Sequence, residues 1–428
     1  MLLTVGQTRE LINRGDFDRA FSRLYVDVSA RLVRDRYLRA IGEFERLFGS
    51  DRKITLISAP GRAEIGGNHT DHQCGCVLAA AVDLDVVCIA SHSNAGTIRV
   101  SSKGYPPQEV SLDVQGPLDA EKGKPASLIR GAVFWFRRNG FTAGGFDAYI
   151  TSDVLEGSGL SSSAAFEVAI GSALNTLYNG GSVTPVEIAL ASRYAENVYF
   201  GKPSGLMDQI ASAHGGLVYI DFAIPGSPAV SPIAFDLTAA GYSLFVVDTK
   251  GSHVGLTSSY AAIPAEMQAV ASVFDRKYLN DVDENEFYSN VPLARERAGD
   301  RAVLRAMHFY SENARVNRQK AALESGDLDL FLRLVVESGE SSVSCLQNIY
   351  AEPEVQDLSV ALAVSRRILS GHGGAWRVHG GGFAGTIQAF VPDNKRQEYR
   401  TAIDSIFGTG SCRALTIRPV GGIELWLN

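Results

Sequence analysis

Residues 156–165 have the composition of an anion-binding loop. They read Glu-Gly-Ser-Gly-Leu-Ser-Ser-Ser-Ala-Ala and lead directly into an apolar stretch. Glycines let a backbone fold closely around an oxyanion, and a helix N-terminus presents unpaired N–H groups with a partial positive charge. The serine hydroxyls add donors and a ligand for a hard cation such as Mg²⁺. We therefore expect an anion cradle here; a serine-rich N-cap after a flexible turn is the alternative.

A second glycine-rich segment, residues 379–385, fits the spacing G-x-G-x-x-G at positions 380, 382 and 385. A dinucleotide fingerprint requires a helix directly after the glycines. Residues 386–391 instead have the composition of a strand, so the segment is interpreted as a turn between two strands. The chain contains no G-x-x-x-x-G-K-[ST] and neither the H-R-D nor the D-F-G motif of protein kinases, so any phosphoryl transfer uses a different cradle.

A third segment, residues 60–72, concentrates polar side chains after a short β-branched run. Donors and acceptors that suit a polyhydroxylated ligand are supplied by Arg62, Asn68, His69, Asp71 and His72. Composition alone leaves a charged, solvated loop as the alternative.

Strands must position these segments. Residues 54–58 are followed by Pro60-Gly61, which predicts a strand and then a turn. Further strands are predicted near the C-terminus and at residues 77–90, 97–101, 146–150, 217–222, 244–248, 376–378 and 386–391.

Helices are predicted on both sides of a domain boundary. Residues 160–178 are too apolar for an exposed helix, which predicts a buried one directly after the cradle. Thr184, Pro185 and Glu187 have the pattern of a capping box, so another helix begins there. Apolar residues at helical spacing predict helices within residues 1–50 and between about 261 and 369.

Mixed helices and strands in two blocks predict an α+β or α/β chain of two domains. The Pro-, Gly- and Ser-rich residues 223–231 suit the boundary between them.

The composition excludes several classes of protein. The 428 residues are 45% hydrophobic and 20% charged, with a formal net charge of −7. This acidic balance offers no global positive field for nucleic acid or an anionic membrane. Five irregularly spaced cysteines argue against a disulfide framework, and the C-x-C of Cys74 and Cys76 lacks the paired spacing of a zinc site. The N-terminus lacks the features of a signal peptide, so we expect a cytoplasmic protein.

Taken together, the three segments resemble the motifs of the GHMP small-molecule kinases. Residues 61–72 are most similar to the galactokinase signature G-R-x-N-x-I-G-E-H-T-D-Y, and residues 205–209, Gly-Leu-Met-Asp-Gln, resemble its G-I-M-D-Q. Ser258-Ser259-Tyr260 resembles the family's S-S-x-Y. The likeness begins near Ile54 and runs to the C-terminus, which leaves the first 50 residues as an extension that it does not place.

The resemblance implies a fold and a reaction. The fold would be the α+β, two-domain GHMP architecture, with a ribosomal protein S5-like N-terminal domain and a ferredoxin-like C-terminal domain. We expect a helical extension over residues 1–50, the first domain over 51–225 and the second over 226–428, with a last strand that returns to the first. The expected reaction is ATP-dependent phosphorylation of a hexose at the C1 hydroxyl, with galactose as the first sugar to test.

The resemblance also implies roles for catalytic and metal-binding residues. Asp208 would lie at the sugar's anomeric hydroxyl as a base or a charge-positioning group. Arg62 would hold Asp208 ionised and counter the charge on the transferring phosphoryl group. Ser163 and Glu196 would hold Mg²⁺, with Glu196 twelve residues before Asp208.

Ligand-binding residues follow from the same resemblance. The sugar pocket would be lined by Asn68, His69, Asp71, Gly205 and Tyr260. The ATP phosphates would lie against Gly157, Ser158, Gly159, Leu160, Ser161 and Ser162. Gly381 and Gly382 would stabilise the lobes from the second domain. We expect a monomer that binds ATP, Mg²⁺ and a small sugar, without nucleic-acid or membrane partners.

Four departures from the family pattern bear on the sugar more than on the reaction. Asn68 replaces a Glu that contacts the C6 hydroxyl in the family, and a buried charge-assisted hydrogen bond is worth about 1.5–3 kcal/mol. The exchange is compatible with galactose and removes a barrier to a C6 carboxylate. The other departures are Glu64 for Asn, His72 for Tyr and His379 for Thr.

Three alternatives stay open. The first is a related sugar 1-kinase that acts on galacturonate, an N-acetylhexosamine or arabinose. The second is a non-catalytic sugar-sensing regulator, although the intact Ser161-Ser162-Ser163 and Asp208 argue against it. The third is a nicotinamide-dependent oxidoreductase built on the turn at residues 380–385.

Overall fold

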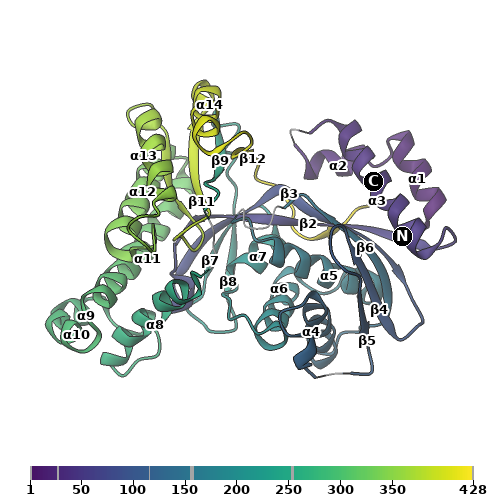
Figure 1. The fold of residues 1–428 in the computed structure, drawn as a ribbon, viewed down its shortest axis with the longest axis horizontal. Coiled ribbons are helices and arrows are strands. Elements are labelled where there is room, and N and C mark those ends of the chain that lie inside the picture. The colour runs from purple at the N-terminus through teal and green to yellow at the C-terminus, as the bar shows by residue number, and fades with distance from the viewer. Residues whose placement is uncertain (1, 27, 115, 155–158, 252–254, 427–428) are drawn as a thin grey trace.

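The computed structural model describes residues 2–26, 28–114, 116–154, 159–251 and 255–426. Within these ranges the chain forms two sheets, each with its own set of helices (Figure 1). None of the described helices is both long enough and apolar enough to cross a membrane.

The first sheet has the order β1-β2-β3-β6-β4-β5, and further described strands join it beside this path. β13 pairs with β2, and β7 pairs with both β3 and β8. Its strands are β1 (Leu3–Thr4), β2 (Lys53–Gly66), β3 (Cys76–His92), β4 (Thr97–Ser102), β5 (Gln108–Ser111), β6 (Phe146–Ser152), β7 (Leu217–Asp221), β8 (Ala229–Ile233) and β13 (Ile423–Glu424). Because β8 belongs to this sheet, the sheet continues beyond residue 225, where the domain boundary was expected.

Helices cover both faces of this sheet, as Figure 1 shows. One face carries α1 (Val5–Arg14), α2 (Asp18–Leu24) and α3 (Ala30–Phe48); the other carries α4 (Pro125–Arg138), α5 (Ser162–Asn179), α6 (Pro185–Tyr194) and α7 (Met207–His214).

The side-chain alternation of the central strands matches these two layers. Leu56 and Val87 pack among the residues of α1–α3, whereas their neighbours Ile57 and Cys88 pack in the core under α4–α7. Successive strand residues point to opposite faces, so a strand covered on both sides needs apolar residues at every position. This explains the nearly unbroken apolar run of β3.

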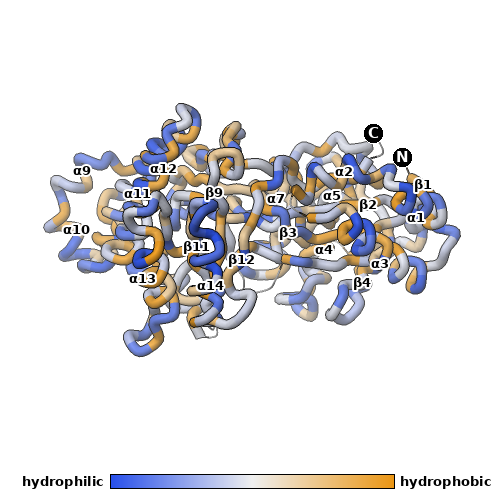
Figure 2. The backbone as a smooth tube through the Cα atoms, turned by 90° about the horizontal axis from the view of Figure 1, so that it is seen from above, coloured by the Kyte–Doolittle hydropathy of each residue, from blue (hydrophilic) through white to orange (hydrophobic). Residues whose placement is uncertain are grey.

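The second lobe contains a four-stranded antiparallel sheet of order β10-β11-β9-β12. Its strands are β9 (Tyr242–Asp248), β10 (Ala375–His379), β11 (Thr386–Pro392) and β12 (Cys412–Leu415). Its helices are α8 (Thr257–Val273), α9 (Glu284–Ser289), α10 (Val291–Ala298), α11 (Asp300–Ser325), α12 (Leu328–Ser341), α13 (Asp357–Leu369) and α14 (Arg396–Phe407). α14 buries only Tyr399 and Ile403, and Figure 2 shows its predominantly hydrophilic course along the outside of the lobe.

One hydrophobic core joins the two lobes. Leu244 and Phe390 of the second sheet belong to the same buried cluster as Ile57 of the first sheet and Phe331 of α12. The candidate site lies where strands of both sheets and the start of α5 meet, so its parts are fixed by a shared core.

Most of the predicted elements agree with the structure, but β8 overlaps residues 223–231, which were expected as a domain boundary, and helices α4 and α14 were not predicted. The capping box of Thr184 and Glu187 is present at the start of α6. The turn predicted at Pro60-Gly61 is wrong, because β2 continues through these residues to Gly66 with a register shift between Pro60 and Arg62. The strand bends at this bulge without ending, and the bend brings Arg62 to the site.

Candidate active site

Asp208 lies at the centre of the site and contacts residues from two distant segments. Arg62 Nε donates to its Oδ1 at 2.8 Å, and Ser161 Oγ donates to its Oδ2 at 2.6 Å. Arg62 also donates through Nη1 to the carbonyl oxygen of Gly159. The structure thus brings Arg62 and Asp208, which were predicted as a catalytic pair, directly together.

These contacts keep the Asp208 carboxylate charged. Burial by itself raises the pKa of Asp208, but the Arg62 charge and the hydrogen bonds from Ser161 and Arg62 outweigh it, so the pKa lies below its ordinary value. The side chain nevertheless remains 31% exposed. Asp208 is therefore an ionised carboxylate that a ligand can reach.

Local backbone geometry explains how Arg62 reaches this position. Its N–H donates to the carbonyl oxygen of Leu160 at 3.0 Å, so β2 contacts the start of the cradle directly. A Cβ on Gly61 would lie 2.8 Å from the same oxygen. Ser212 of α7 donates to the carbonyl oxygen of Pro60 at 2.6 Å, which ties the helix that carries Asp208 to the bulge.

The described part of the cradle leaves the N-terminus of α5 without a side-chain cap. Ser161 is the N-cap residue, but its φ is 58° and its hydroxyl makes no capping hydrogen bond. The hydroxyl binds Asp208 instead, which disagrees with the alternative of a plain serine N-cap. Of the predicted ATP-binding residues, Gly159, Leu160, Ser161 and Ser162 lie here, while Gly157 and Ser158 fall outside the described residues.

The second lobe closes directly against this cradle. Gly159 has a φ of +71°, and a Cβ there would overlap Thr386 Oγ1 and lie 3.1 Å from His379 Nδ1. His379 Nε2 accepts the N–H of Glu64 at 3.0 Å, so this histidine touches the first segment as well. Burial and the charges of Arg62 and Arg377 lower the pKa of His379 well below its usual value, which keeps the ring neutral.

The glycine turn of residues 380–382 accepts hydrogen bonds from three predicted sugar-pocket residues. Asn68 Nδ2 lies 2.7 Å from the oxygen of Gly380, His69 Nε2 lies 3.0 Å from that of Gly381, and Tyr260 Oη lies 2.8 Å from that of Gly382. Burial and the neighbouring His72 lower the pKa of His69 to about 3. The neutral ring can donate through Nε2 to the turn and accept at Nδ1 from His72, 3.0 Å away.

Asp71 and Gly205, two further predicted sugar-pocket residues, lie close to each other. A Cβ on Gly205 would overlap the Asp71 carboxylate, so the loop before α7 approaches that carboxylate with no side chain between them. Asn68, in contrast, is fully buried and makes hydrogen bonds at both ends of its amide. It donates to Glu64 and to Gly380, and it accepts from Asn348 at 2.9 Å. These protein partners leave neither amide hydrogen of Asn68 for a sugar.

The predicted metal ligand Glu196 lies in a short π-helix, residues Ala195–Phe200, and is 3% exposed. Its carboxylate receives Lys202 Nζ at 2.8 Å on Oε1, and Ser204 Oγ at 2.6 Å and Gln209 Nε2 at 2.9 Å on Oε2. Gln209 also donates to Glu167 Oε2 at 3.2 Å. Glu167 follows the predicted ligand Ser163 by one turn of α5, so the two share a helix face.

Comparisons with known proteins cover most of the chain. Residues 127–216 match the family described as the GHMP kinases N terminal domain, and residues 42–92 match the galactokinase galactose-binding signature. The galactokinase of Streptomyces coelicolor (strain ATCC BAA-471 / A3(2) / M145) is 32% identical over 382 residues, which cover 87% of this chain and 94% of that protein. The chain belongs to the galactokinase family.

Solved structures confirm the predicted GHMP fold. The crystal structure of Lactococcus lactis galactokinase complexed with galactose superposes with a TM-score of 0.78 at 23% identity, covering 90% of this chain and 98% of that one. The mevalonate kinase of Methanococcus jannaschii gives a TM-score of 0.59 at 15% identity, covering 85% and 98%. The two-domain GHMP architecture and a sugar kinase activity that uses ATP, both expected from the motifs, are therefore features of this family member.

The matched regions coincide with the site. The galactose-binding signature contains Arg62, Asn68, His69 and Asp71, and the GHMP domain match contains residues 159–163, Glu196 and Asp208. Sequence reasoning missed Glu167, Lys202 and Gln209. A single Glu in an otherwise apolar buried helix was a signal for Glu167, whereas Lys202 is found only through its spatial contact.

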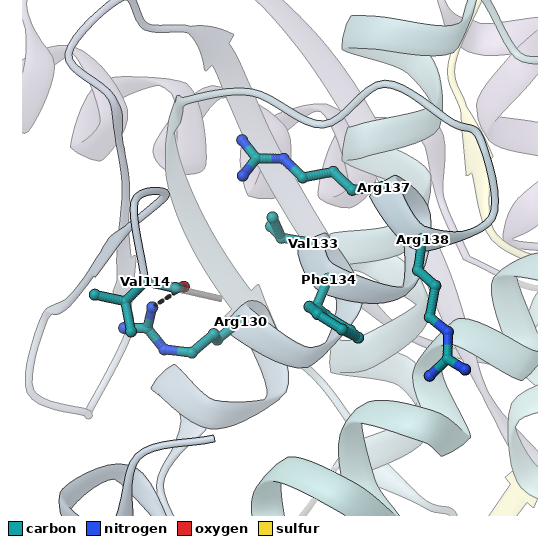
Figure 3. Close-up of a pocket in the computed structure, with 6 residues that line it drawn as sticks. All are labelled: Val114, Arg130, Val133, Phe134, Arg137 and Arg138. Carbon is teal, nitrogen blue, oxygen red and sulfur yellow. Dashed lines mark hydrogen bonds between the residues drawn. The ribbon is translucent and has the colours of Figure 1, made fainter. Parts of the chain in front are cut away.

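A pocket of about 290 Å³ lies elsewhere in the galactokinase-family fold, along α4 (Figure 3). It is lined by Val114, Arg130, Val133, Phe134, Arg137 and Arg138. Arg130 pairs with Glu121 at 2.6 Å and Arg137 donates to the carbonyl oxygen of Leu112 at 2.9 Å, so these two charges serve the local structure. The pocket shares no residue with the three glycine-rich segments.

Proposed function

We propose that this protein transfers the γ-phosphoryl group of ATP to the C1 hydroxyl of galactose. The observation that carries the proposal is the position of Asp208, an ionised and partly exposed carboxylate held by Arg62 and Ser161. One of these partners belongs to the sugar-binding segment and the other to the phosphate cradle. The family relationship and the galactose-binding signature support galactose as the acceptor.

In this mechanism the chain mainly positions reactants and stabilises charge. Asp208 accepts the proton of the C1 hydroxyl. It also orients the oxygen of that hydroxyl toward the γ-phosphoryl group of ATP. Arg62 keeps Asp208 ionised and balances negative charge on the group in transfer. The uncapped start of α5, at Ser161 and Ser162, supplies N–H groups and a helix dipole to the phosphates.

The sugar would lie between the first segment and the loop before α7. We propose that His69, Asp71, Gly205 and Tyr260 line its pocket, because the structure places them around the glycine turn and beside the loop that leads to Asp208. Asn68 shapes this pocket through Gly380, since its own amide is occupied by protein partners.

We further propose that Mg²⁺ binds with ATP at Ser163, Glu196 and Glu167. Hydroxyl and carboxylate oxygens are the donors that Mg²⁺ prefers, together with substrate phosphates and water. Oε1 of Glu167 is buried and has no hydrogen-bond partner among the described residues, as expected of an acceptor next to a cation site. The described residues hold no cluster of three or more His, Cys, Asp or Glu, so phosphates and water must complete the shell. When bound, Mg²⁺ neutralises phosphate charge.

The test is ADP release measured with galactose, galacturonate, an N-acetylhexosamine and arabinose in parallel. Galactose should give the highest kcat/KM. Asp208→Asn should retain the far-UV circular dichroism of the wild type and lose about 10²–10⁴-fold in kcat, because it cannot accept the proton. Wild-type turnover in this variant would contradict the catalytic role.

Other outcomes discriminate between the remaining functions. A higher kcat/KM for galacturonate than for galactose would identify galacturonate as the substrate. Sugar binding without ATP consumption would indicate a sensor. The expected monomeric state stays a prediction that light scattering can check, and the expected cytoplasmic location stays one for cell fractionation.

A further inference from the structure

Lys202 extends from the loop between the π-helix and α7 back onto the π-helix. The N–H groups of Gly201 and Lys202 donate to the carbonyl oxygen of Glu196 at 3.0 and 3.1 Å, which fixes the backbone of the loop. The side chain then places Nζ 2.8 Å from Oε1 of the same glutamate. The Lys202 side chain is 58% exposed, whereas that of Glu196 is 4% exposed. A solvent-facing cation is thus paired with a buried carboxylate.

The remaining contacts of Glu196 indicate that Oε1 is the carboxylate oxygen whose partner can be exchanged. Oε2 accepts from Ser204 and from Gln209, and the Gln209 residue is only 1% exposed. Ser204 is a short side chain of the loop, and Gln209 is a buried side chain of α7. The ammonium on Oε1 is the partner with a long, flexible stem. A metal cation that binds Oε1 is therefore repelled by the Lys202 ammonium as long as that ammonium stays there.

The surroundings of Lys202 are strongly acidic. Asp208 and Glu167 act electrostatically on the Lys202 ammonium in addition to its ion-pair partner Glu196. The Lys202 charge in turn helps to keep the pKa of Asp208 low. The ammonium thus lies within electrostatic reach of both the catalytic carboxylate and the candidate metal ligands.

We propose that Lys202 and Mg²⁺ compete for Oε1 of Glu196, and that binding of Mg–ATP releases the Lys202 ammonium to the nucleotide phosphates. This inference rests on the proposed function, which places nucleotide and metal at this site. Before the metal arrives, Lys202 supplies the positive charge that the carboxylates need. Afterwards the same ammonium pairs with phosphate oxygen, so Glu196 has a cation beside it in both states.

Competition predicts opposite effects on two binding steps. Removing the ammonium should strengthen metal binding, because the metal no longer displaces a cation from Glu196. Removing it should weaken metal-free nucleotide binding, because the carboxylates then repel the phosphates without compensation. A purely structural role for Lys202 would weaken both steps together.

Calorimetric titration of the full chain can separate these cases. A non-hydrolysable ATP analogue is titrated with a chelator present, and Mg²⁺ is then titrated into the chelator-free enzyme–analogue complex. We expect Lys202→Met to bind Mg²⁺ about tenfold more tightly and the metal-free analogue about tenfold more weakly than the wild type. Lys395→Met is the control, because Lys395 also makes a 2.8 Å ion pair, with Glu398, but on the second lobe.

A double-mutant cycle identifies Glu196 as the shared partner. In the Glu196→Gln background, the Lys202→Met change should no longer tighten Mg²⁺ binding. Lys202→Gln serves as a second variant if the methionine variant unfolds. Unchanged or weaker Mg²⁺ binding in a folded Lys202 variant would overturn the competition. If the wild type itself bound no nucleotide, the proposed function would fail together with this inference, and the two failures are thereby distinguishable.

Discussion

At the residue scale, the site depends on a carboxylate that stays ionised although it is largely enclosed. Asp208 achieves this because Arg62 and Ser161 each satisfy one of its oxygens. Both partners also contact the cradle, since Arg62 binds the carbonyl oxygen of Gly159 and Ser161 is the N-cap of α5. A change in either partner should therefore alter the charge and the position of Asp208 together.

Replacing Arg62 should move the acid limb of the pH–rate profile. Arg62 lowers the pKa of Asp208 against the opposing effect of burial, so the wild type keeps Asp208 ionised below the ordinary aspartate range. In Arg62→Gln the effect of burial dominates, so the pKa of Asp208 rises. As the pH is lowered, kcat should therefore begin to fall at a higher pH than in the wild type. Loss of the guanidinium should also reduce the maximal kcat by about 10²-fold.

Arg62→Lys is the matched variant for this experiment. It keeps a positive charge beside Asp208 but loses the fork that also reaches Gly159. Its acid limb should lie between those of the wild type and Arg62→Gln. An acid limb that is identical in all three proteins would show that a group other than Asp208 controls it.

Sequence spacing located the residues of the site that lie within recognisable motifs and missed those that depend on tertiary contact. Arg62, Ser161 and Asp208 were predicted, and the structure brings them together. Lys202 carries no local signal, because a lysine after a glycine is typical of any exposed loop. Its role follows from its contact with the buried carboxylate of Glu196, six residues earlier. An α-helix of ordinary pitch would not bring two side chains six residues apart into contact.

At the element scale, two departures from regular geometry build the cradle. β2 continues through a bulge at Pro60 to Arg62, and α5 begins at Ser161 in the left-handed region. The first was predicted as a turn, because Pro-Gly ends most strands. The strand continues here because residues 62–66 pair with β3 beyond the register shift. The second has no sequence signature, since left-handed serine is uncommon and is held here by contact with Asp208.

Gly159 should not tolerate a side chain, because a Cβ there would overlap Thr386. Gly180, which has a positive φ but no such neighbour, serves as the comparison. Gly159→Ala meets both a positive φ and an overlap with Thr386, while Gly180→Ala, at the far end of α5, meets only a positive φ of +57°. We expect Gly159→Ala to weaken ATP binding by about tenfold or more, because relief of the overlap must shift the cradle or β11. Gly180→Ala should leave ATP binding unchanged, as calorimetric titration would show.

A compensating change tests the cause of this effect. Thr386→Ala removes the overlapping oxygen, so the double variant Gly159→Ala/Thr386→Ala should recover part of the lost affinity. Equal weakening in the Gly159 and Gly180 variants would instead assign the effect to backbone strain and remove the close approach as an explanation.

At the scale of the whole molecule, the first 50 residues complete the fold. Their apolar residues, among them Phe21, Tyr37 and Phe44, cover the outer face of β2, β3 and β6. The helical character of this extension was predicted, but its place was not, because nothing in a local pattern states which face of a distant sheet needs a cover. Without α1–α3 that face would expose Leu56, Val87 and Ile89, and the strand that carries Arg62 would lose one of its two packing layers.

The extension is also joined to the sheet by a buried ionic group. Arg36 of α3 lies 2.5 Å from Asp85 of β3, and Tyr25 donates to the same carboxylate at 2.6 Å. Asp85 is fully buried and also lies 3.4 Å from Arg418, near the C-terminus. Burial alone would raise the pKa of Asp85, but Arg36 and Arg418 outweigh it and lower the pKa.

Removal of one member of this group should destabilise the protein strongly. Arg36→Gln leaves the Asp85 charge with one cation in place of two, and breaking a buried pair in this way costs about 3 kcal/mol. Denaturant unfolding at neutral pH would measure the loss. Arg46→Gln on the same helix is the control, because the pair of Arg46 with Glu43 is exposed and contributes little. An equal loss in both variants would refute the special role of the buried group.

The pH dependence of this loss gives an independent check. A carboxylate with a lowered pKa stabilises the folded state above its unfolded pKa, and this contribution disappears as the pH falls through the folded pKa. The difference in unfolding free energy between wild type and Arg36→Gln should therefore be largest near neutrality and shrink in acid. A difference that stayed constant down to acidic pH would mean that Arg36 acts through packing of its aliphatic stem, and that the extension is held by its apolar face alone.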